Sequence, residues 1–145
     1  MEMTGKSLEA FTEAAAAFAK ELRPKADGAT LITLSGELGA GKTAFVKAAA
    51  RALGVKEDIT SPTFVLLKAY ALPQGNAFGR LVHIDAYRLE SGEELAPLRF
   101  DEYMNDAANL IMLEWPEKLA DTLPAPAMRI GIEALPDSMR KITYG

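Results

Sequence analysis

The sequence contains no cysteine, so disulfide bonds and cysteine-based metal sites are excluded. No apolar run approaches the length of a membrane span, and the first residues lack the basic and apolar blocks of a signal peptide. Basic residues are also few, since 16 Lys and Arg stand against 20 Asp and Glu for a net charge of −4. This balance is poorly suited to gripping nucleic acid directly. We therefore expect a soluble cytoplasmic protein with no membrane association.

The chain also lacks internal repeats, linkers and low-complexity segments. Its 145 residues, of which 49% are hydrophobic and 25% charged, are enough for one domain with a substantial core. We therefore expect a single domain over residues 1–145.

Strands and helices alternate through the middle of the chain. Apolar runs predict strands at residues 30–35, 81–85 and 110–114, and the last run suits a strand covered on both faces. Residues 7–22 and 42–53 predict two longer helices. The shorter elements predicted are a β-like segment at 64–70, a turn at 73–76, helical pieces from Ser91, at 100–104 and at 116–123, and a hairpin of strands 128–135 and 140–144. This order favours an α/β domain of three layers, with a mostly parallel central sheet and an antiparallel closing hairpin.

The most specific motif is Gly-Glu-Leu-Gly-Ala-Gly-Lys-Thr at residues 36–43. It matches G-x-x-x-x-G-K-S/T, the phosphate-binding loop of nucleotide triphosphatases, and it has the required strand before it and helix after it. Lys42 is predicted to reach the β- and γ-phosphates, and the Thr43 hydroxyl to ligate Mg²⁺. The free N–H groups and dipole at the start of the helix also favour anions. The domain is thus predicted to be P-loop NTPase-like, with a nucleotide held by Glu37, Leu38, Gly39, Ala40, Gly41, Lys42, Thr43 and Ala44.

Two acids end apolar strands, Asp85 in Leu-Val-His-Ile-Asp and Glu114 in Leu-Ile-Met-Leu-Glu. Ligands of α/β sheets collect at the carboxyl ends of strands, and phosphate loops need a further acid for Mg²⁺. The alternatives are a surface ion pair of Asp85 with Arg88 and a solvent-facing Glu114. We predict Lys42, Asp85 and Glu114 as catalytic residues. Thr43, Glu114 and Asp85 are the predicted metal ligands, and the division of metal binding and water orientation between the two acids is open, with Glu114 favoured at the metal.

Three other features have two interpretations each. The hydroxyls of Thr60 and Thr63 could sense the γ-phosphate, as switch segments do, although a hydroxyl-rich turn is favoured by spacing alone. His83, the only histidine, is expected to be packed or partly exposed rather than catalytic. Trp115 is expected to plug a core edge rather than stack on a base. The base-specifying motif Asn-Lys-x-Asp of GTP-binding switch proteins is absent, which favours ATP over GTP.

The order and spacing of four motifs resemble the TsaE family, the bacterial ATPases required for threonylcarbamoyladenosine formation in tRNA. The motifs are the phosphate loop, Thr-Ser-Pro-Thr-Phe at 60–64, His-Ile-Asp-Ala-Tyr-Arg-Leu at 83–89 and Glu-Trp-Pro-Glu at 114–117. The resemblance covers over half of the chain. It implies binding of ATP and Mg²⁺, slow ATP hydrolysis, and docking on the partner proteins TsaD and TsaB, through which tRNA is reached. Self-association of the free chain is compatible with the sequence.

The resemblance also implies roles for individual residues. Lys42 and Thr43 match the phosphate and metal residues, and residues 60–63 match the first switch segment. Asp85 matches the family's essential acid, and Glu114 its strand-end acid that holds the metal or orients water. The chain departs from the family pattern at Glu37, where Asp is more usual, and at Ala44, where Thr is common.

Two alternatives from other classes remain at this point. A small-molecule kinase also uses a phosphate loop, but it needs an acceptor pocket and usually an arginine-bearing lid, for which the sequence offers only Arg88. A nucleotide-sensing binding module would not need two strand-end acids beside Lys42 and Thr43.

Overall fold

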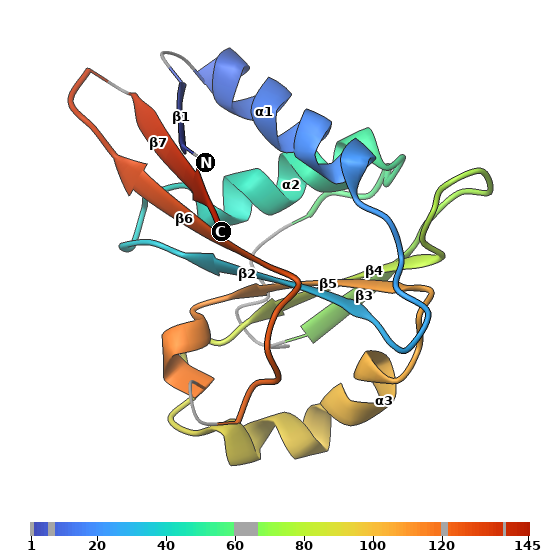
Figure 1. Ribbon diagram of the computed structural model, residues 1–145. Helices are drawn as coiled ribbons and strands as arrows, with labels where there is room; N and C mark the ends of the chain where they lie inside the picture. The colour runs from blue at the N-terminus through green and yellow to red at the C-terminus, as the bar shows by residue number, and fades with distance from the viewer. Residues whose placement is uncertain (1, 6–7, 60–66, 120–121, 138) are drawn as a thin grey trace.

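The computed structural model describes residues 2–5, 8–59, 67–119, 122–137 and 139–145 (Figure 1). They form a seven-stranded sheet in the order β1-β7-β6-β2-β5-β4-β3. The strands are β1 (Glu2–Gly5), β2 (Thr30–Ser35), β3 (Leu67–Ala71), β4 (Arg80–Asp85), β5 (Asn109–Glu114), β6 (Met128–Ala134) and β7 (Arg140–Tyr144).

The four central strands, β6, β2, β5 and β4, run parallel. Strands β7 and β1 extend the sheet antiparallel at one side, and β3 does so at the other. The predicted mostly parallel central sheet and the closing β6–β7 hairpin are therefore confirmed. Strand β1, which pairs with β7 at the sheet edge, was not predicted.

Helices cover both faces of the sheet, which confirms the three layers (Figure 1). Helices α1 (Leu8–Glu21) and α2 (Lys42–Ala52) lie on one face, where Phe45 of α2 contacts Phe11 and Phe18 of α1. The other face carries the 3₁₀ helix η1 (Gly92–Leu98), helix α3 (Phe100–Met104) and the 3₁₀ helix η2 (Pro116–Leu119).

Strand alternation divides the core into two parts. Leu110 and Met112 of β5 belong to the apolar cluster beneath α1 and α2, while Ile111 and Leu113 belong to the cluster beneath η1 and α3. Both faces of β5 are thus buried, as its continuous apolar run predicts. Because side chains alternate along a strand, Glu114 follows Met112 onto the α2 side. The same rule places the last residue of β4, Asp85, on the side of Leu81, which also lies beneath α2.

Of the helix predicted at residues 116–123, the described helical part is the 3₁₀ helix η2, and residues 120–121 lie outside the described residues. Helix η2 ends at Leu119, and the N–H of Thr122 donates to the carbonyl of Leu119 at 2.9 Å in a turn. This turn brings the Thr122 side chain against Gly92, where an added Cβ would overlap it. The N–H of Leu123 also donates to the carbonyl of Leu119, at 3.2 Å. In the strand predicted at 64–70, the described part is β3 from Leu67, and residues 64–66 lie outside the described residues.

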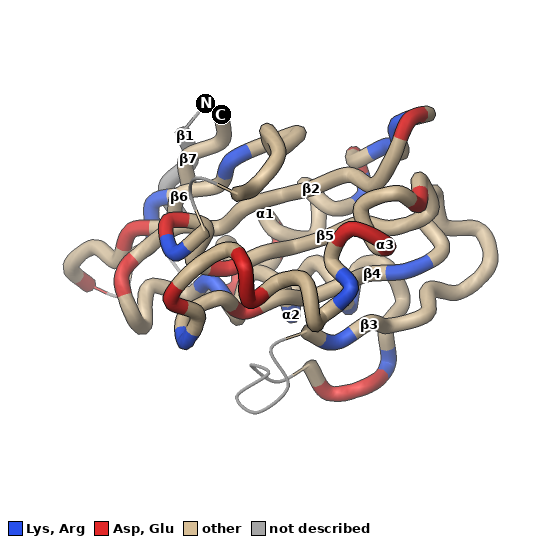
Figure 2. Tube along the Cα trace, turned by 90° about the horizontal axis from the view of Figure 1, so that it is seen from below, with Lys and Arg blue, Asp and Glu red and all other residues tan. Residues whose placement is uncertain are grey.

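Charge is mixed along the chain. In Figure 2 acidic and basic segments alternate along the trace, and the basic segments of this view do not merge into a continuous strip. No helix within the described residues has the length and apolar character needed to cross a membrane.

The turn after α2 packs against the β3–β4 connection, and two glycines allow this contact to be tested. Gly54 and Gly75 have positive φ angles of 95° and 98°. A Cβ on Gly54 would lie 2.9 Å from Cγ of Pro73, whereas nothing lies within 4 Å of a Cβ on Gly75. Gly75→Ala should therefore cost only the left-handed conformation, about 1–2 kcal/mol. Gly54→Ala should lower the free energy of unfolding by more, because Pro73 must also move. Urea unfolding measures both variants, and equal costs would contradict the close approach.

Candidate nucleotide-binding site

The loop at residues 36–43 joins the end of β2 to the start of α2. The N–H of Ala40 donates to the carbonyl of Glu37 at 3.0 Å and closes a turn, and the N–H of Phe45 donates to the carbonyl of Gly41 at 2.9 Å and begins the helix. The loop therefore lies at the carboxyl edge of the parallel strands, where α/β sheets bind their ligands. The strand and helix predicted on either side of it are confirmed.

The Lys42 side chain folds back over this loop. Its Nζ donates to the carbonyl oxygens of Gly36, at 2.5 Å, and of Glu37, at 2.9 Å. The residue is only 4% exposed, and burial lowers the pKa of Lys42, while the carboxylates of Glu114, Glu117 and Asp85 act in the opposite direction. The cation is thus held within the loop whose backbone is expected to surround phosphate.

The Thr43 hydroxyl contacts the carboxylate of Glu114. Its Oγ1 lies 3.0 Å from both Oε1 and Oε2 of that residue, which is 71 positions away in the sequence. Thr43 is the second residue of α2 and Glu114 is the last residue of β5, so the contact joins helix to sheet. Glu114 is 2% exposed, and the alternative of a solvent-facing acid is therefore wrong.

His83 also contacts Glu114. Its Nε2 lies 2.5 Å from Oε2, and the histidine has no exposed surface. The expectation of a packed residue is correct, but the contact with the strand-end acid was missed. Strand alternation carried the signal, because His83 lies two residues before Asp85 and therefore on the same face.

Asp85 lies beside Glu114 at the edge of the sheet, because the two residues are partners in the register of β4 and β5. The Asp85 side chain is half-buried, and its Oδ1 accepts a hydrogen bond from the N–H of Tyr87 at 3.0 Å. Such a side-chain turn fixes an aspartate just after a strand. The structure therefore brings Lys42, Thr43, Asp85 and Glu114 together at one edge of the sheet.

Trp115 covers the outer side of Lys42. The Lys42 Nζ lies 4.1 Å from the centroid of the indole ring. The centroid of the Tyr87 ring lies 5.0 Å from the centroid of the Trp115 ring. Trp115 is half-buried and packs against the apolar cluster beneath η1 and α3, as expected of a residue at a core edge. Its contact with Lys42 was not predicted.

An open hollow of about 550 Å³ lies beside the loop. It is lined by Gly36, Glu37 and Leu38 of the loop and by Trp115 and Glu117. Leu38 at its rim is 74% exposed. Of the other predicted nucleotide-binding residues, Glu37, Gly39 and Ala44 are exposed, Gly41 is half-buried and Ala40 is buried. Thr60 and Thr63 lie outside the described residues.

One arginine near the loop was not anticipated from the sequence. Arg140, at the start of β7, has its Nε 3.7 Å from the position of a Cβ added to Gly41. It is half-buried, and its Nη1 donates to the carbonyl of Met139 at 3.2 Å. Arg140 therefore flanks the phosphate loop on the side of the closing hairpin.

The residues at the sheet edge fit a magnesium ion that arrives with phosphate. Among the described residues, no group of three or more His, Asp or Glu side chains could hold a metal by itself. Magnesium sites for nucleotides commonly use one or two carboxylates and complete the shell with phosphate oxygens and water. The Thr43 hydroxyl and the adjoining Glu114 carboxylate, with Asp85 in the next strand, provide such a partial donor set.

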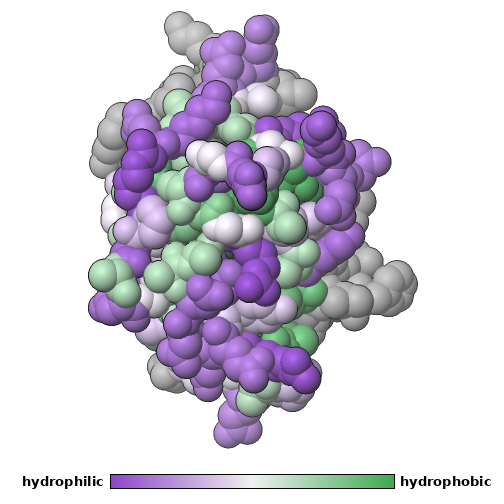
Figure 3. All heavy atoms as spheres, turned by 90° about the vertical axis from the view of Figure 1, so that its right-hand side faces the viewer, coloured by the Kyte–Doolittle hydropathy of each residue, from purple (hydrophilic) through white to green (hydrophobic). Residues whose placement is uncertain are grey.

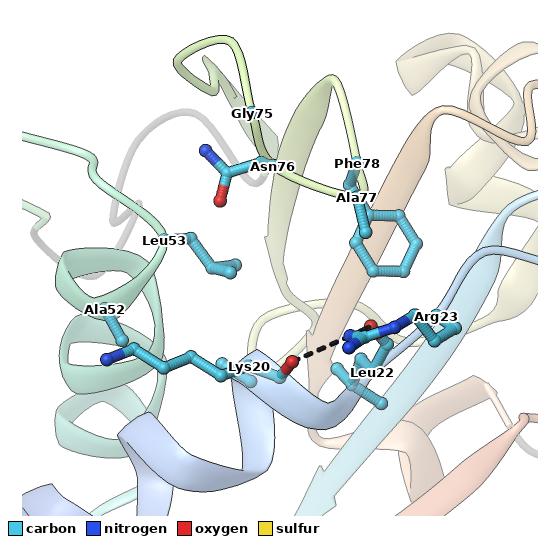
Figure 4. Close-up of a pocket in the computed structure, with 10 residues that line it drawn as sticks. Lys20, Leu22, Arg23, Ala52, Leu53, Gly75, Asn76, Ala77 and Phe78 are labelled. Carbon is cyan, nitrogen blue, oxygen red and sulfur yellow. Dashed lines mark hydrogen bonds between the residues drawn. The ribbon is translucent and has the colours of Figure 1, made fainter.

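A second hollow lies at the other end of β4, between the ends of α1 and α2 and the β3–β4 connection (Figure 4). Arg23 lines this hollow, and its Nη1 donates to the carbonyl of Lys20, at the end of α1, at 2.7 Å. Figure 3 shows the molecule from the side of the β3–β4 connection, where hydrophobic groups are visible between hydrophilic ones. None of the predicted site residues lines this hollow.

Comparison with known proteins agrees with the motifs. The family described as Threonylcarbamoyl adenosine biosynthesis protein TsaE matches residues 6–142. The chain belongs to the TsaE family. Its role therefore lies in the biosynthesis of threonylcarbamoyladenosine in tRNA.

Individual TsaE relatives match most of the chain. A protein of Treponema pallidum named tRNA threonylcarbamoyladenosine biosynthesis protein TsaE is 40% identical over 116 residues, covering 79% of this chain and 80% of that protein. The Bacillus subtilis protein of the same name is 35% identical over 139 residues, covering 94% and 77%. The crystal structure of Bacillus subtilis YdiB is similar with a TM-score of 0.77 and 28% identity, covering 99% of this chain and 83% of that one. This likeness agrees with the α/β fold.

The contact between Lys42 and Trp115 can be tested by fluorescence, because Trp115 is the only tryptophan. A protonated amine against an indole ring quenches its emission by proton transfer in the excited state. Lys42→Met should therefore raise the emission intensity of the nucleotide-free protein. Lys47→Met, which alters an exposed lysine of the same helix, is the matched control and should leave the intensity unchanged. Equal emission from Lys42→Met and the unaltered protein would contradict the contact.

Proposed function

We propose that this TsaE-family protein binds ATP with Mg²⁺, hydrolyses ATP slowly and supports threonylcarbamoyladenosine modification of tRNA together with TsaD and TsaB. The observation that carries the ATPase proposal is the hydrogen bond from Thr43 to Glu114, beside Lys42 and Asp85. A phosphate-loop hydroxyl next to a strand-end acid is the arrangement used for nucleotide-bound Mg²⁺. The tRNA part rests on the family and on the names of its relatives.

In this proposal Lys42 moves from the carbonyls of Gly36 and Glu37 to phosphate oxygens. A lysine that is already buried needs little further loss of water, so its charge acts strongly on the phosphates. Thr43 turns its hydroxyl oxygen towards the metal and keeps the start of α2 at the site. A bound magnesium ion supplies charge neutralisation for the phosphates.

The two acids take different roles in the proposal. Glu114 is held by two neighbouring side chains and belongs to the metal shell, directly or through water. Asp85 is half-buried and lies nearer the open side, where it orients the attacking water. The sequence offers no obvious arginine finger, and Arg140, which flanks the loop, donates its Nη1 to the carbonyl of Met139. Because an arginine finger is worth roughly 10³–10⁵ in rate where measured, turnover by the protein alone should be slow.

The hydrolysis proposal is tested by release of free phosphate from Mg-ATP with no added acceptor. We expect weak basal turnover, well below the roughly 1–100 s⁻¹ of kinases. Lys42→Ala should abolish turnover, and Asp85→Ala and Glu114→Ala should each lower it, while Lys47→Ala serves as the control. Full activity in either acid variant would remove that acid from the scheme. Phosphate release only with an added acceptor would favour a kinase, and nucleotide binding without turnover would favour a sensing module.

The partner proposal is tested by tRNA modification over many turnovers, with TsaD, TsaB and the carbamoyl donor supplied. Adding this protein should increase the amount of modified tRNA, and Lys42→Ala should not. The isolated protein should bind bare tRNA weakly, because its net charge is −4. No effect of the protein on modification would contradict the proposed role.

A further inference from the structure

His83 is a buried polar residue for which the proposed reaction has so far no use. Its side chain is fully enclosed, and its Nε2 lies 2.5 Å from Oε2 of Glu114. The other ring nitrogen, Nδ1, is also buried and has no hydrogen-bond partner among the described residues. In the register of β4 and β5, His83 pairs with Met112, two residues before the pair formed by Asp85 and Glu114.

The hydrogen of the imidazole can be assigned from this geometry. Carboxylate oxygens accept hydrogen bonds, so Nε2 must carry the hydrogen that it donates to Glu114. His83 is therefore oriented by the contact with Glu114.

Thr43 and His83 hold different parts of the Glu114 carboxylate. The Thr43 hydroxyl is equidistant from both oxygens, whereas His83 contacts Oε2 alone. The Thr43 hydroxyl can give a lone pair to a metal and still donate its hydrogen to Glu114, but at equal distances it does not distinguish the two carboxylate oxygens. His83 does distinguish them, because it contacts Oε2 alone.

We propose that His83 is the positioning residue of the metal site: it holds Oε2 of Glu114 and thereby leaves Oε1 for a metal beside Thr43. This inference rests on the proposed Mg-ATP binding. A residue placed only for packing would not need a polar ring here, because its strand neighbours Leu81 and Met112 are apolar and equally buried. A donor behind a metal-binding carboxylate fixes its orientation, and loss of such a donor typically costs 10–100-fold in metal affinity or activity.

The test compares nucleotide affinity with and without the metal. The dissociation constant of a non-hydrolysable ATP analogue is measured in Mg²⁺ and in EDTA, for the unaltered protein, His83→Leu, His83→Gln and Met112→Leu. Gln can present an N–H donor near the position of Nε2, whereas Leu removes the donor. Met112→Leu is the matched control, because Met112 is the strand partner of His83 and is also fully buried.

We expect Mg²⁺ to tighten binding by the unaltered protein, and His83→Leu to lose about 10–100-fold of that gain while its affinity in EDTA is unchanged. His83→Gln should keep most of the gain, and Met112→Leu all of it. If His83→Leu weakens binding equally in Mg²⁺ and EDTA, or keeps the full gain, the inference is wrong. If thermal melting shows that His83→Leu does not fold, His83→Asn, whose amide is too short to reach Glu114, takes its place with the same expected loss. Absence of any Mg²⁺ gain in the unaltered protein would instead overturn the proposed function, and this inference with it.

Discussion

The burial of the Glu114 carboxylate is the constraint on which the rest of the site depends. A charge at 2% exposure is tolerated only when it is paired or hydrogen-bonded, because leaving it unpaired costs several kcal/mol. The partners come from two other elements, Thr43 at the start of α2 and His83 in β4. Satisfying this one carboxylate therefore fixes where α2 begins relative to β5, and with it where the preceding loop ends. The loop at residues 36–43 is thus positioned by the hydrogen bonds that satisfy Glu114.

A second consequence concerns the balance of charge around Lys42. Three carboxylates, those of Glu114, Glu117 and Asp85, act on this one ammonium group, while burial opposes its charge. In the free protein the ammonium is satisfied by two loop carbonyls and by the face of Trp115. Acids in excess over bases at this edge of the sheet favour the arrival of a further cation. The carboxylates would repel a phosphate group that arrives alone. A phosphate group that carries Mg²⁺ is complementary in charge to both Lys42 and the carboxylates.

The sequence predicts the central fold well, because its signals there are local and strong. The phosphate-loop motif predicts a strand before it and a helix after it, and the apolar runs that end at Asp85 and Glu114 predict two further strands. Lys42, Thr43, Asp85 and Glu114 could therefore be expected at the carboxyl edge of the sheet. The features that the sequence did not predict depend on contacts between residues far apart in the chain. Strand β1 pairs with the edge of β7, which lies more than 130 positions away in the sequence. From the sequence His83 is expected to be an ordinary packed residue. Its contact with Glu114 becomes visible only when β4 and β5 are paired in register.

The central claim is that these residues form one site for Mg-ATP, and a crystal structure with Mg²⁺ and a non-hydrolysable ATP analogue tests it most directly. The expected result is a phosphate group within the loop at residues 36–43, with Nζ of Lys42 moved from the carbonyls of Gly36 and Glu37 onto phosphate oxygen. The Thr43 hydroxyl should lie at the metal, with Glu114 in or next to its shell. A nucleotide bound elsewhere, with Lys42 still bonded to its own loop, would contradict the claim.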